Sequence, residues 1–340
     1  MSKARQLADN GAATPHRNIL INGGMQISQR SVSVTGLGAN ASPSYSTVDR
    51  FGVYSLGSSA GRYTMTQETI TDLPSFAKCM KLACTTADTS IAAGEALIPT
   101  QIVEGQNLFR TAKGTSGALQ WTISFYVKAN AAFNYVLDVY ENDSSRLASR
   151  MFATTTSWVR HEFTIPADTA NGTITNDNTA SLYLGFILHA GSNFTSGTMN
   201  QTTWADITNA NRAPGVSSFY SSTNNTFFLT GVQLEVGEAA TPFEHKTFAE
   251  DLAECQRYCY FHSPSGASVV VQYQGSYRAF QAEFPVTMRA APSASVGNFS
   301  GFSAFGGSST STTSFYGYVA KGSTDTNSLT VGNVKIESEL

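Results

Sequence analysis

Residues 119–128 constrain the fold more strongly than any other segment of the chain. In this segment (LQWTISFYVK) the odd positions are apolar and the even positions are mostly polar. A period of two places the apolar side chains on one face, which predicts a half-buried β-strand. Four more short runs rich in apolar residues follow this segment and predict further strands, at 135–140, 158–165, 182–188 and 227–236. No long helical pattern intervenes, so an antiparallel β-sandwich is favoured over parallel βαβ units.

The composition agrees with a β-rich, ordered protein. Charged residues make up 13% of the 340 residues, about half of the roughly 25% usual in soluble domains. Ser, Thr, Asn and Gly take their place, while 41% hydrophobic and 11% aromatic residues are too many for a disordered chain. The net charge is -3 and no basic tract occurs. We therefore expect no nucleic-acid partner.

No targeting or membrane segment is evident. The first ten residues (MSKARQLADN) lack the apolar core of a secretory signal. No stretch approaches the roughly 18 apolar residues of a membrane-spanning helix. We therefore expect synthesis in a host cytoplasm and no membrane span. The four cysteines lack zinc-site spacing and are expected to be plain thiols packed as small apolar side chains.

The chain is expected to divide at residues 17, 246 and 262. Residues 1–17 are polar and predict either a segment that orders against a partner or a frayed terminus. The apolar run at 18–25, closed by two glycines, predicts the first strand of a large β-domain covering 18–246. Residues 263–340 are rich in Gly, Ser and Thr and predict a small β-rich module that needs neighbouring chains for stability.

A helix is predicted over residues 247–261. Thr247 can cap it, and Glu250 stands three residues later, as in a capping box. Apolar side chains recur along it with a period of about 3.5, at Phe248, Leu252, Cys255 and Cys259. Two alternatives remain open. This seam packs on the chain's own sheet, or it forms a trimer interface where three copies meet on an axis.

Several segments together resemble a known class of protein. Residues 17–30 (RNILINGGMQISQR) are similar to the opening of phage tail-fibre and virion appendage proteins. Residues 230–237 (TGVQLEVG) and 240–245 resemble the last strand of their jelly-roll domain. Residues 251–258 resemble the helix that follows it, and residues 284–292 resemble their tip module. The segments occur in the order typical of that class.

The resemblance implies a structural virion component of the tail-fibre type that attaches to the host. It implies an antiparallel jelly-roll sandwich at 18–246 that is similar to carbohydrate-binding modules. A trimerising helix at 247–262 and a tip at 263–340 would follow, in a homotrimer. Residues 1–17 would attach to a tail or neck protein of the virion. No catalytic motif comes with the resemblance, so no enzyme is expected.

A carbohydrate site needs aromatic faces for the C–H side of a sugar ring and fixed polar groups for its hydroxyls. Strand alternation turns several such residues away from the core, and Trp204 lies on a long loop. The predicted site therefore contains Tyr126, Asp138, Tyr140, Tyr183 and Trp204. Alternatively, these are ordinary sheet or interface aromatics. Trp121 and Phe125 are predicted to be core residues.

Signals for catalysis or metal binding are weak. Residues 57–61 (GSSAG) fit G-x-S-x-G, and residues 36–41 fit a loose dinucleotide fingerprint, but neither has the flanking strand and helix. Asp138, Glu141 and Glu162 offer carboxylates, as any β-protein does. We expect no cofactor and no metal-ligand set. A structural calcium ion is compatible with the Asp- and Asn-rich turns, although no EF-hand loop occurs.

Two other functions remain as alternatives to a fibre that recognises host-surface glycan. A head or neck decoration protein would need the same anchor, fold and symmetry. A depolymerase tailspike would need a long repetitive β-helix pattern with a carboxylate cluster, and the sequence has neither.

Overall fold

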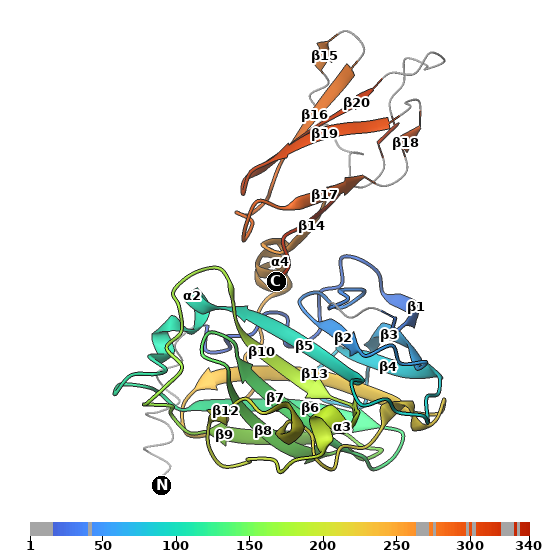
Figure 1. Cartoon of the computed structure of the whole chain (residues 1–340). Helices are drawn as coiled ribbons and strands as arrows, with labels where there is room; N and C mark the ends of the chain where they lie inside the picture. The colour runs from blue at the N-terminus through green and yellow to red at the C-terminus, as the bar shows by residue number, and fades with distance from the viewer. Residues whose placement is uncertain are drawn as a thin grey trace. The chain divides into compact units, whose positions relative to one another are not determined.

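The structure is a computed structural model that describes residues 16–39, 43–262, 272–274, 277–296, 299–300, 304–320, 330–331 and 334–340. The chain divides into two compact units, which are described separately (Figure 1). The first unit comprises residues up to Gln26 together with Ser31–Lys246, and the second comprises Ile27–Arg30 together with Thr247–Leu340. Most of the predicted attachment segment, residues 1–15, lies outside the described residues.

The first sheet of the first unit contains six strands in antiparallel order β1-β3-β4-β13-β6-β9. Their bounds are β1 (Ser33–Leu37), β3 (Arg62–Thr69), β4 (Lys78–Thr86), β13 (Thr226–Val236), β6 (Trp121–Ala129) and β9 (Val159–Ile165). In β6 the alternation predicted from the sequence holds on the inner face, where Trp121 and Phe125 are 2% and 0% exposed. Both are therefore core residues, as predicted.

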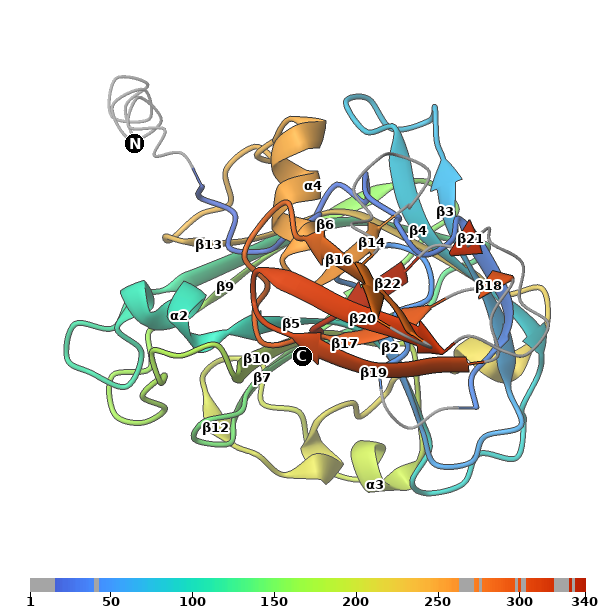
Figure 2. The ribbon, with the colours of Figure 1, turned by 90° about the horizontal axis from the view of Figure 1, so that it is seen from above.

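The second sheet contains seven strands, in order β11-β5-β10-β7-β8-β12 with β2 paired to β5. Figure 2 shows β5, β10 and β7 side by side. The bounds are β2 (Gly52–Leu56), β5 (Ala96–Glu104), β7 (Asn134–Glu141), β8 (Arg146–Ala153), β10 (Ala180–Ile187), β11 (His189–Ala190) and β12 (Ala205–Asp206). Short helical turns connect the strands, namely α2 (Gly105–Leu108), η1 (Phe109–Thr111), α3 (Ser192–Thr195), η2 (Asn209–Asn211) and η3 (Phe219–Ser221).

The two sheets pack face to face around one apolar core. Phe125 of the first sheet meets Phe152 and Phe186 of the second sheet edge-on, with ring centroids 5.2 and 5.0 Å apart. Burying a side chain of this size contributes about 1.5–3 kcal/mol. The first unit is thus an antiparallel jelly-roll sandwich, which confirms the predicted fold class.

Residues 18–25 do not form the predicted first strand. Their backbone turns into the left-handed region at Asn22 and Met25, both with φ 58°, so it cannot stay extended. The segment is instead pinned beside β13 by the Asn18 amide, which donates to Val232 O (3.0 Å) and accepts from Leu234 N (3.0 Å). The Asn18 side chain thereby makes hydrogen bonds to β13 that a paired strand would make with its backbone.

The second unit begins with helix α4 (Phe248–Gln256), and the predicted capping box between Thr247 and Glu250 is confirmed. The helix ends earlier than predicted, because the aromatic run that follows Arg257 favours a strand and pairs with β22. Cys259 is the first residue of that strand, so the four-residue helical seam is wrong. Phe248 is 63% exposed, while Cys255 and Cys259 are buried.

The remaining described strands of the second unit form small antiparallel sheets, in orders β14-β22-β17, β15-β16-β20-β19 and β18-β21. Their bounds are β14 (Cys259–His262), β15 (Gln272–Gln274), β16 (Tyr277–Glu283), β17 (Ser293–Val296), β18 (Phe299–Ser300), β19 (Ala304–Thr310), β20 (Ser314–Ala320), β21 (Thr330–Val331) and β22 (Val334–Glu337). Residues 27–30 join this unit through Arg30, which pairs with Glu337 and Glu339 at 2.9 Å each.

All four cysteines are buried free thiols, as predicted. None of the helices within the described ranges has the length and apolar character needed to cross a membrane.

Candidate functional site: a tyrosine-lined pocket on the second sheet

Strand register brings several outward-facing residues of the second sheet together. Tyr183 of β10 pairs with Tyr140 of β7, and Gly185 pairs with Asp138 two residues along. On the other side of β10, β5 and then β2 continue the sheet and bring in Tyr54. Since residues two apart on a strand share a face, these side chains form one surface.

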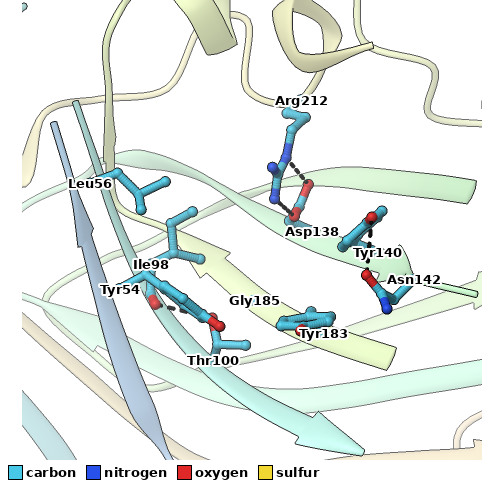
Figure 3. A pocket seen from close by; sticks show the side chains of 10 residues that line it. All are labelled: Tyr54, Leu56, Ile98, Thr100, Asp138, Tyr140, Asn142, Tyr183, Gly185 and Arg212. Carbon is cyan, nitrogen blue, oxygen red and sulfur yellow. Dashed lines mark hydrogen bonds and ion pairs between the residues drawn. The ribbon is translucent and has the colours of Figure 1, made fainter. Parts of the chain in front are cut away.

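A pocket of about 270 Å³ lies on this surface. Figure 3 shows its walls, which come from β2, β5, β7, β10 and the long loop after β12. The lining residues are Tyr54, Leu56, Ile98, Thr100, Asp138, Tyr140, Asn142, Tyr183, Gly185 and Arg212. The pocket therefore combines aromatic and aliphatic walls with a small number of polar groups, which is the usual composition of a small-molecule site.

Three tyrosines form the aromatic part of the pocket. The Tyr140 and Tyr183 rings have centroids 5.6 Å apart and are tilted by 37°, and Tyr54 lies 6.4 Å from Tyr183. Burial, together with the neighbouring Tyr183 phenol, raises the pKa of Tyr54 to about 12. Burial also raises the pKa of Tyr183. At neutral pH these phenols are uncharged hydrogen-bonding groups on apolar rings.

One ion pair lies in the wall of the pocket. Arg212 donates to both carboxylate oxygens of Asp138, at 2.6 and 3.3 Å, and Asp138 is almost fully buried. Figure 3 shows the guanidinium directed at this carboxylate. The guanidinium also lies 5.8 Å from the ring centroids of Tyr140 and Phe194. A two-point pair held between two rings fixes the Arg212 side chain and neutralises its charge.

Gly185 and Asn142 shape the floor and rim. A Cβ at position 185 would stand 2.8 Å from Ile98 Cγ2 and 3.3 Å from Thr100 Oγ1, so any larger side chain would occupy the pocket. Asn142 accepts from the Tyr140 hydroxyl at 3.3 Å and donates to Ala180 O at 3.2 Å. The rim is therefore positioned before any ligand arrives.

The structure brings together Asp138, Tyr140 and Tyr183 from the predicted set. Tyr126 lies on the first sheet instead, where its ring packs on Phe76 at 5.2 Å. Trp204 does not present an aromatic face to solvent. It is 8% exposed, meets Trp121 edge-on at 5.4 Å, and donates to Pro166 O at 2.9 Å. The prediction that loop position makes Trp204 available was wrong, because the loop folds this ring into the core.

Sequence reasoning missed Tyr54 and Arg212. Tyr54 lies in an apolar run before the clear alternation begins, and only its pairing with β5 brings it to the pocket. Arg212 lies on the loop between β12 and η3, where no periodicity applies. The sequence shows only that this arginine lies in a long loop rich in aromatic residues. That position does not indicate which carboxylate it pairs with.

The weak catalytic motifs have structural explanations. Ser59 of the G-x-S-x-G segment is buried and donates to Asp88 Oδ2 at 2.8 Å, while Gly61 N donates to Ser59 Oγ. Glu141 pairs with Lys113, and Glu162 pairs with Arg160. Among the described residues, no group of three or more His, Cys, Asp or Glu side chains is arranged to hold a metal ion.

Comparisons with known proteins give similarity at the level of fold only. No protein-family model matches the chain, and no curated protein sequence matches it. A CBM4 structure aligns with 64% of this chain and 98% of its own, at 12% identity and TM-score 0.31. A family 11 carbohydrate-binding module of a Clostridium thermocellum cellulosomal cellulase aligns with 62% of this chain and 99% of its own, at 12% identity and TM-score 0.29. The enzymatically active domain of tailspike protein 4 of bacteriophage CBA120 aligns with 66% of this chain and 22% of its own, at 10% identity and TM-score 0.30. At these scores we draw no functional conclusion from the similarity.

Proposed function

We propose that the first unit binds an uncharged glycan in the pocket formed by Tyr54, Tyr140 and Tyr183. The observation that carries this proposal is the cluster of three tyrosines around a preformed pocket. Tyrosine rings offer apolar faces to the C–H side of a sugar, and their hydroxyls bond to sugar hydroxyls. The Asp138–Arg212 pair and Asn142 add fixed polar groups at the wall.

The charge of the pocket favours a neutral ligand. Among the described residues that line it, Asp138 and Arg212 alone are charged, and they neutralise each other. An anionic sugar would have to compete with Asp138 for the guanidinium. Breaking a buried pair leaves an uncompensated charge and is strongly unfavourable.

We propose that binding is not followed by cleavage. Glycoside hydrolysis ordinarily uses two carboxyl groups on either side of the scissile bond. Asp138 is the one carboxylate that the structure places in the pocket wall, and Arg212 holds both of its oxygens. Incubation of the protein with any glycan that it binds should leave the glycan length unchanged, and shortened products would overturn this part of the proposal.

The binding site is tested with Tyr183→Ala, using Tyr126→Ala as the matched control on the first sheet. A panel of neutral and anionic oligosaccharides identifies the ligand, and calorimetry measures its affinity. Removing a central aromatic contact costs about 2 kcal/mol, or about 30-fold in affinity. Tyr126→Ala should bind as the wild type does. Equal losses in both variants, or binding of anionic glycans only, would contradict the proposal.

We further propose that the chain is a fibre-like virion component that acts as a homotrimer and attaches through residues 1–17. Its support is the resemblance of residues 17–30, 230–237, 240–245, 251–258 and 284–292 to phage appendage proteins. The exposed Phe248 at the start of α4 offers an apolar contact for another chain. A decoration protein of the head or neck remains the alternative, and antibody labelling of intact particles separates the two.

Oligomeric state is measured by light scattering on the full chain and on Phe248→Asp. A mass of three chains that falls in the variant would support a trimer with a contact at Phe248. A monomeric full chain would overturn the trimer without affecting the proposed glycan pocket.

A further inference from the structure

A buried lysine sits in a cage of oxygen atoms at the end of the sandwich. The Lys113 side chain is 2% exposed, and its ammonium lies 3.3–3.4 Å from four oxygens. These oxygens are Glu141 Oε2, Asp168 Oδ2, Asn171 O and Gly172 O. Lysine is almost never fully buried unless it is paired, so this arrangement requires an explanation.

All four contacts are hydrogen bonds, and together they enclose the ammonium in a cage of oxygen atoms. An ammonium has three N–H donors, while four oxygens surround this one at nearly equal distances. The distances exceed the 2.7–2.9 Å typical of a charge-assisted hydrogen bond. Carboxylate oxygens mixed with backbone carbonyls are the ligands that a hard divalent cation such as Ca²⁺ prefers.

The backbone is shaped around this charge. Gly172 has φ +86°, and a Cβ there would lie 1.9 Å from Lys113 Nζ. Gly114 has φ +80°, and a Cβ there would lie 2.4 Å from Thr173 N. The loop after η1 and the loop at 171–173 therefore approach each other closely, and glycine is needed at both positions.

The neighbouring charged residues do not fully neutralise the carboxylates of the cage, so the Lys113 ammonium is needed to balance them. Arg146 neutralises part of Asp168 at 2.9 Å, but it also pairs with Asp206 at 2.6 Å. Glu141 is fully buried, and burial raises its pKa although Lys113 opposes the shift. The Trp204 ring closes one side of the cage, with its centroid 4.4 Å from the ammonium.

We propose that the Lys113 ammonium is the built-in structural cation of the first unit, and that removing it converts the cage into a Ca²⁺ site. The protein would then be independent of divalent cations, and a variant without this ammonium would depend on them. Ca²⁺ binds oxygens at about 2.3–2.6 Å, so the two carboxylates must move inward, and water would complete the coordination. This proposal is independent of the glycan pocket.

The test is Lys113→Ala in the full chain, compared with Lys128→Ala. Lys128 is a matched control because it also pairs with a carboxylate, Asp72, and lies 5.0 Å from a tryptophan ring, Trp158, but its carboxylate partner is exposed. Without added metal, Lys113→Ala should lower the melting temperature of the first unit by about 10 °C, since a buried pair is broken. Millimolar Ca²⁺ should restore most of that loss and should not affect the wild type or Lys128→Ala.

Terbium provides a second readout through Trp204. Tb³⁺ accepts excitation energy from a nearby tryptophan, so Tb³⁺ bound in the cage of Lys113→Ala should luminesce on excitation of Trp204, and Ca²⁺ should displace it. Lys113→Met keeps the volume without leaving room for an ion, so it should be destabilised and insensitive to Ca²⁺. The double variant Lys113→Ala/Glu141→Gln removes one carboxylate and should lose the calcium response.

Any of three results with a folded Lys113→Ala protein would overturn the proposal. Lys113→Ala could be as stable as the wild type, its stability could be unaffected by Ca²⁺, or its terbium signal could be no greater than that of Lys128→Ala. Failure of Lys113→Ala to fold in both the presence and the absence of Ca²⁺ would also overturn it, because the ion is expected to replace the ammonium. Folding only in Ca²⁺ would support it.

Discussion

The outer faces of the two sheets in the first unit differ in how far the rest of the chain covers them. On the second sheet, Tyr54, Tyr140 and Tyr183 line an open pocket. On the first sheet, Thr122 and Ser124 also point away from the core, yet they are only 1% and 2% exposed. Alternation therefore identifies the side chains that leave the core but not the sheet face that stays uncovered.

The cover of the first sheet is the chain segment that follows β13. Thr122 Oγ1 donates to Gly237 O at 2.8 Å, and Arg160 donates to Thr241 O at 2.7 Å. Glu235 holds the same segment by accepting from the Thr241 backbone N–H at 2.9 Å and hydroxyl at 2.7 Å. A local set of hydrogen bonds thus closes one face. On the other face, the loop that carries Arg212 packs beside Tyr140 but leaves the pocket between the tyrosines open.

The largest effect is expected from removing this cover. Glu235→Ala deletes the carboxylate that accepts from the Thr241 backbone N–H, the Thr241 hydroxyl and the Gln233 amide, so the free energy of unfolding should fall by about 3 kcal/mol. Hydrogen exchange at residues 237–245 should accelerate as well. Denaturant unfolding and hydrogen exchange measure the two effects, and the exposed Glu238→Ala is the control. A change below 0.5 kcal/mol would mean that the cover is held by other contacts.

A somewhat smaller effect is expected from closing the open face. Gly185→Val places a branched side chain against Ile98 and Thr100, which should cost about 1–3 kcal/mol of stability through overpacking and fill the pocket floor. Glycan binding should be lost, and calorimetry measures this loss. Gly117→Val is the control, because a Cβ there meets no atom closer than 3.8 Å. Retained glycan affinity in a folded Gly185→Val protein would show that the ligand binds elsewhere.

A pH effect should also distinguish the sheets. Burial lowers the pKa of His189 at the edge of the second sheet, against the opposing effects of Glu95 and Asp88, and burial lowers that of His161 on the first. Between the unfolded value of about 6.5 and the lower folded value, the unfolded chain holds more protons. Stability should therefore fall as the pH drops below about 6.5 and level off below the folded pKa.

The fully buried His189 should contribute more to this loss than His161, which is partly exposed. Denaturant unfolding between pH 7.5 and 5 measures the slope for His189→Gln and His161→Gln. The dependence of the unfolding free energy on pH should weaken more in His189→Gln than in His161→Gln. An unchanged slope in that variant would mean that the histidine contributes through its contact with Ser218 and not through titration.

The sequence predicted the strands whose two faces differ, and it predicted three pocket residues through that alternation. It did not predict β5, because every residue of Ala96–Glu104 is buried and no alternation exists to be detected. It placed Trp204 outside because loop position was taken as exposure, whereas its indole N–H finds a carbonyl inside. Arg212 depends on a loop conformation, which local patterns do not encode.

The smallest expected effect concerns lysines that cover aromatic rings on the first sheet. Lys128 lies 5.0 Å from the Trp158 ring and 4.9 Å from the Phe228 ring, whereas the tyrosines of the pocket have no lysine among the described lining residues. Lys128→Ala should cost less than about 1 kcal/mol, because its partner Asp72 is exposed and solvent screens the ion pair.

The same variant should uncover Trp158, and tryptophan fluorescence can report this. The chain has 3 tryptophans, and Trp121 and Trp204 are 2% and 8% exposed, so acrylamide reaches mainly Trp158. Quenching should increase in Lys128→Ala and stay unchanged in Lys81→Ala, whose ammonium covers Phe228 alone. Unchanged quenching in Lys128→Ala would show that the Nε1 bond to Asp72 (2.9 Å) already sets the exposure of Trp158. The first sheet would then owe its closed face to residues 237–245 and not to its lysines.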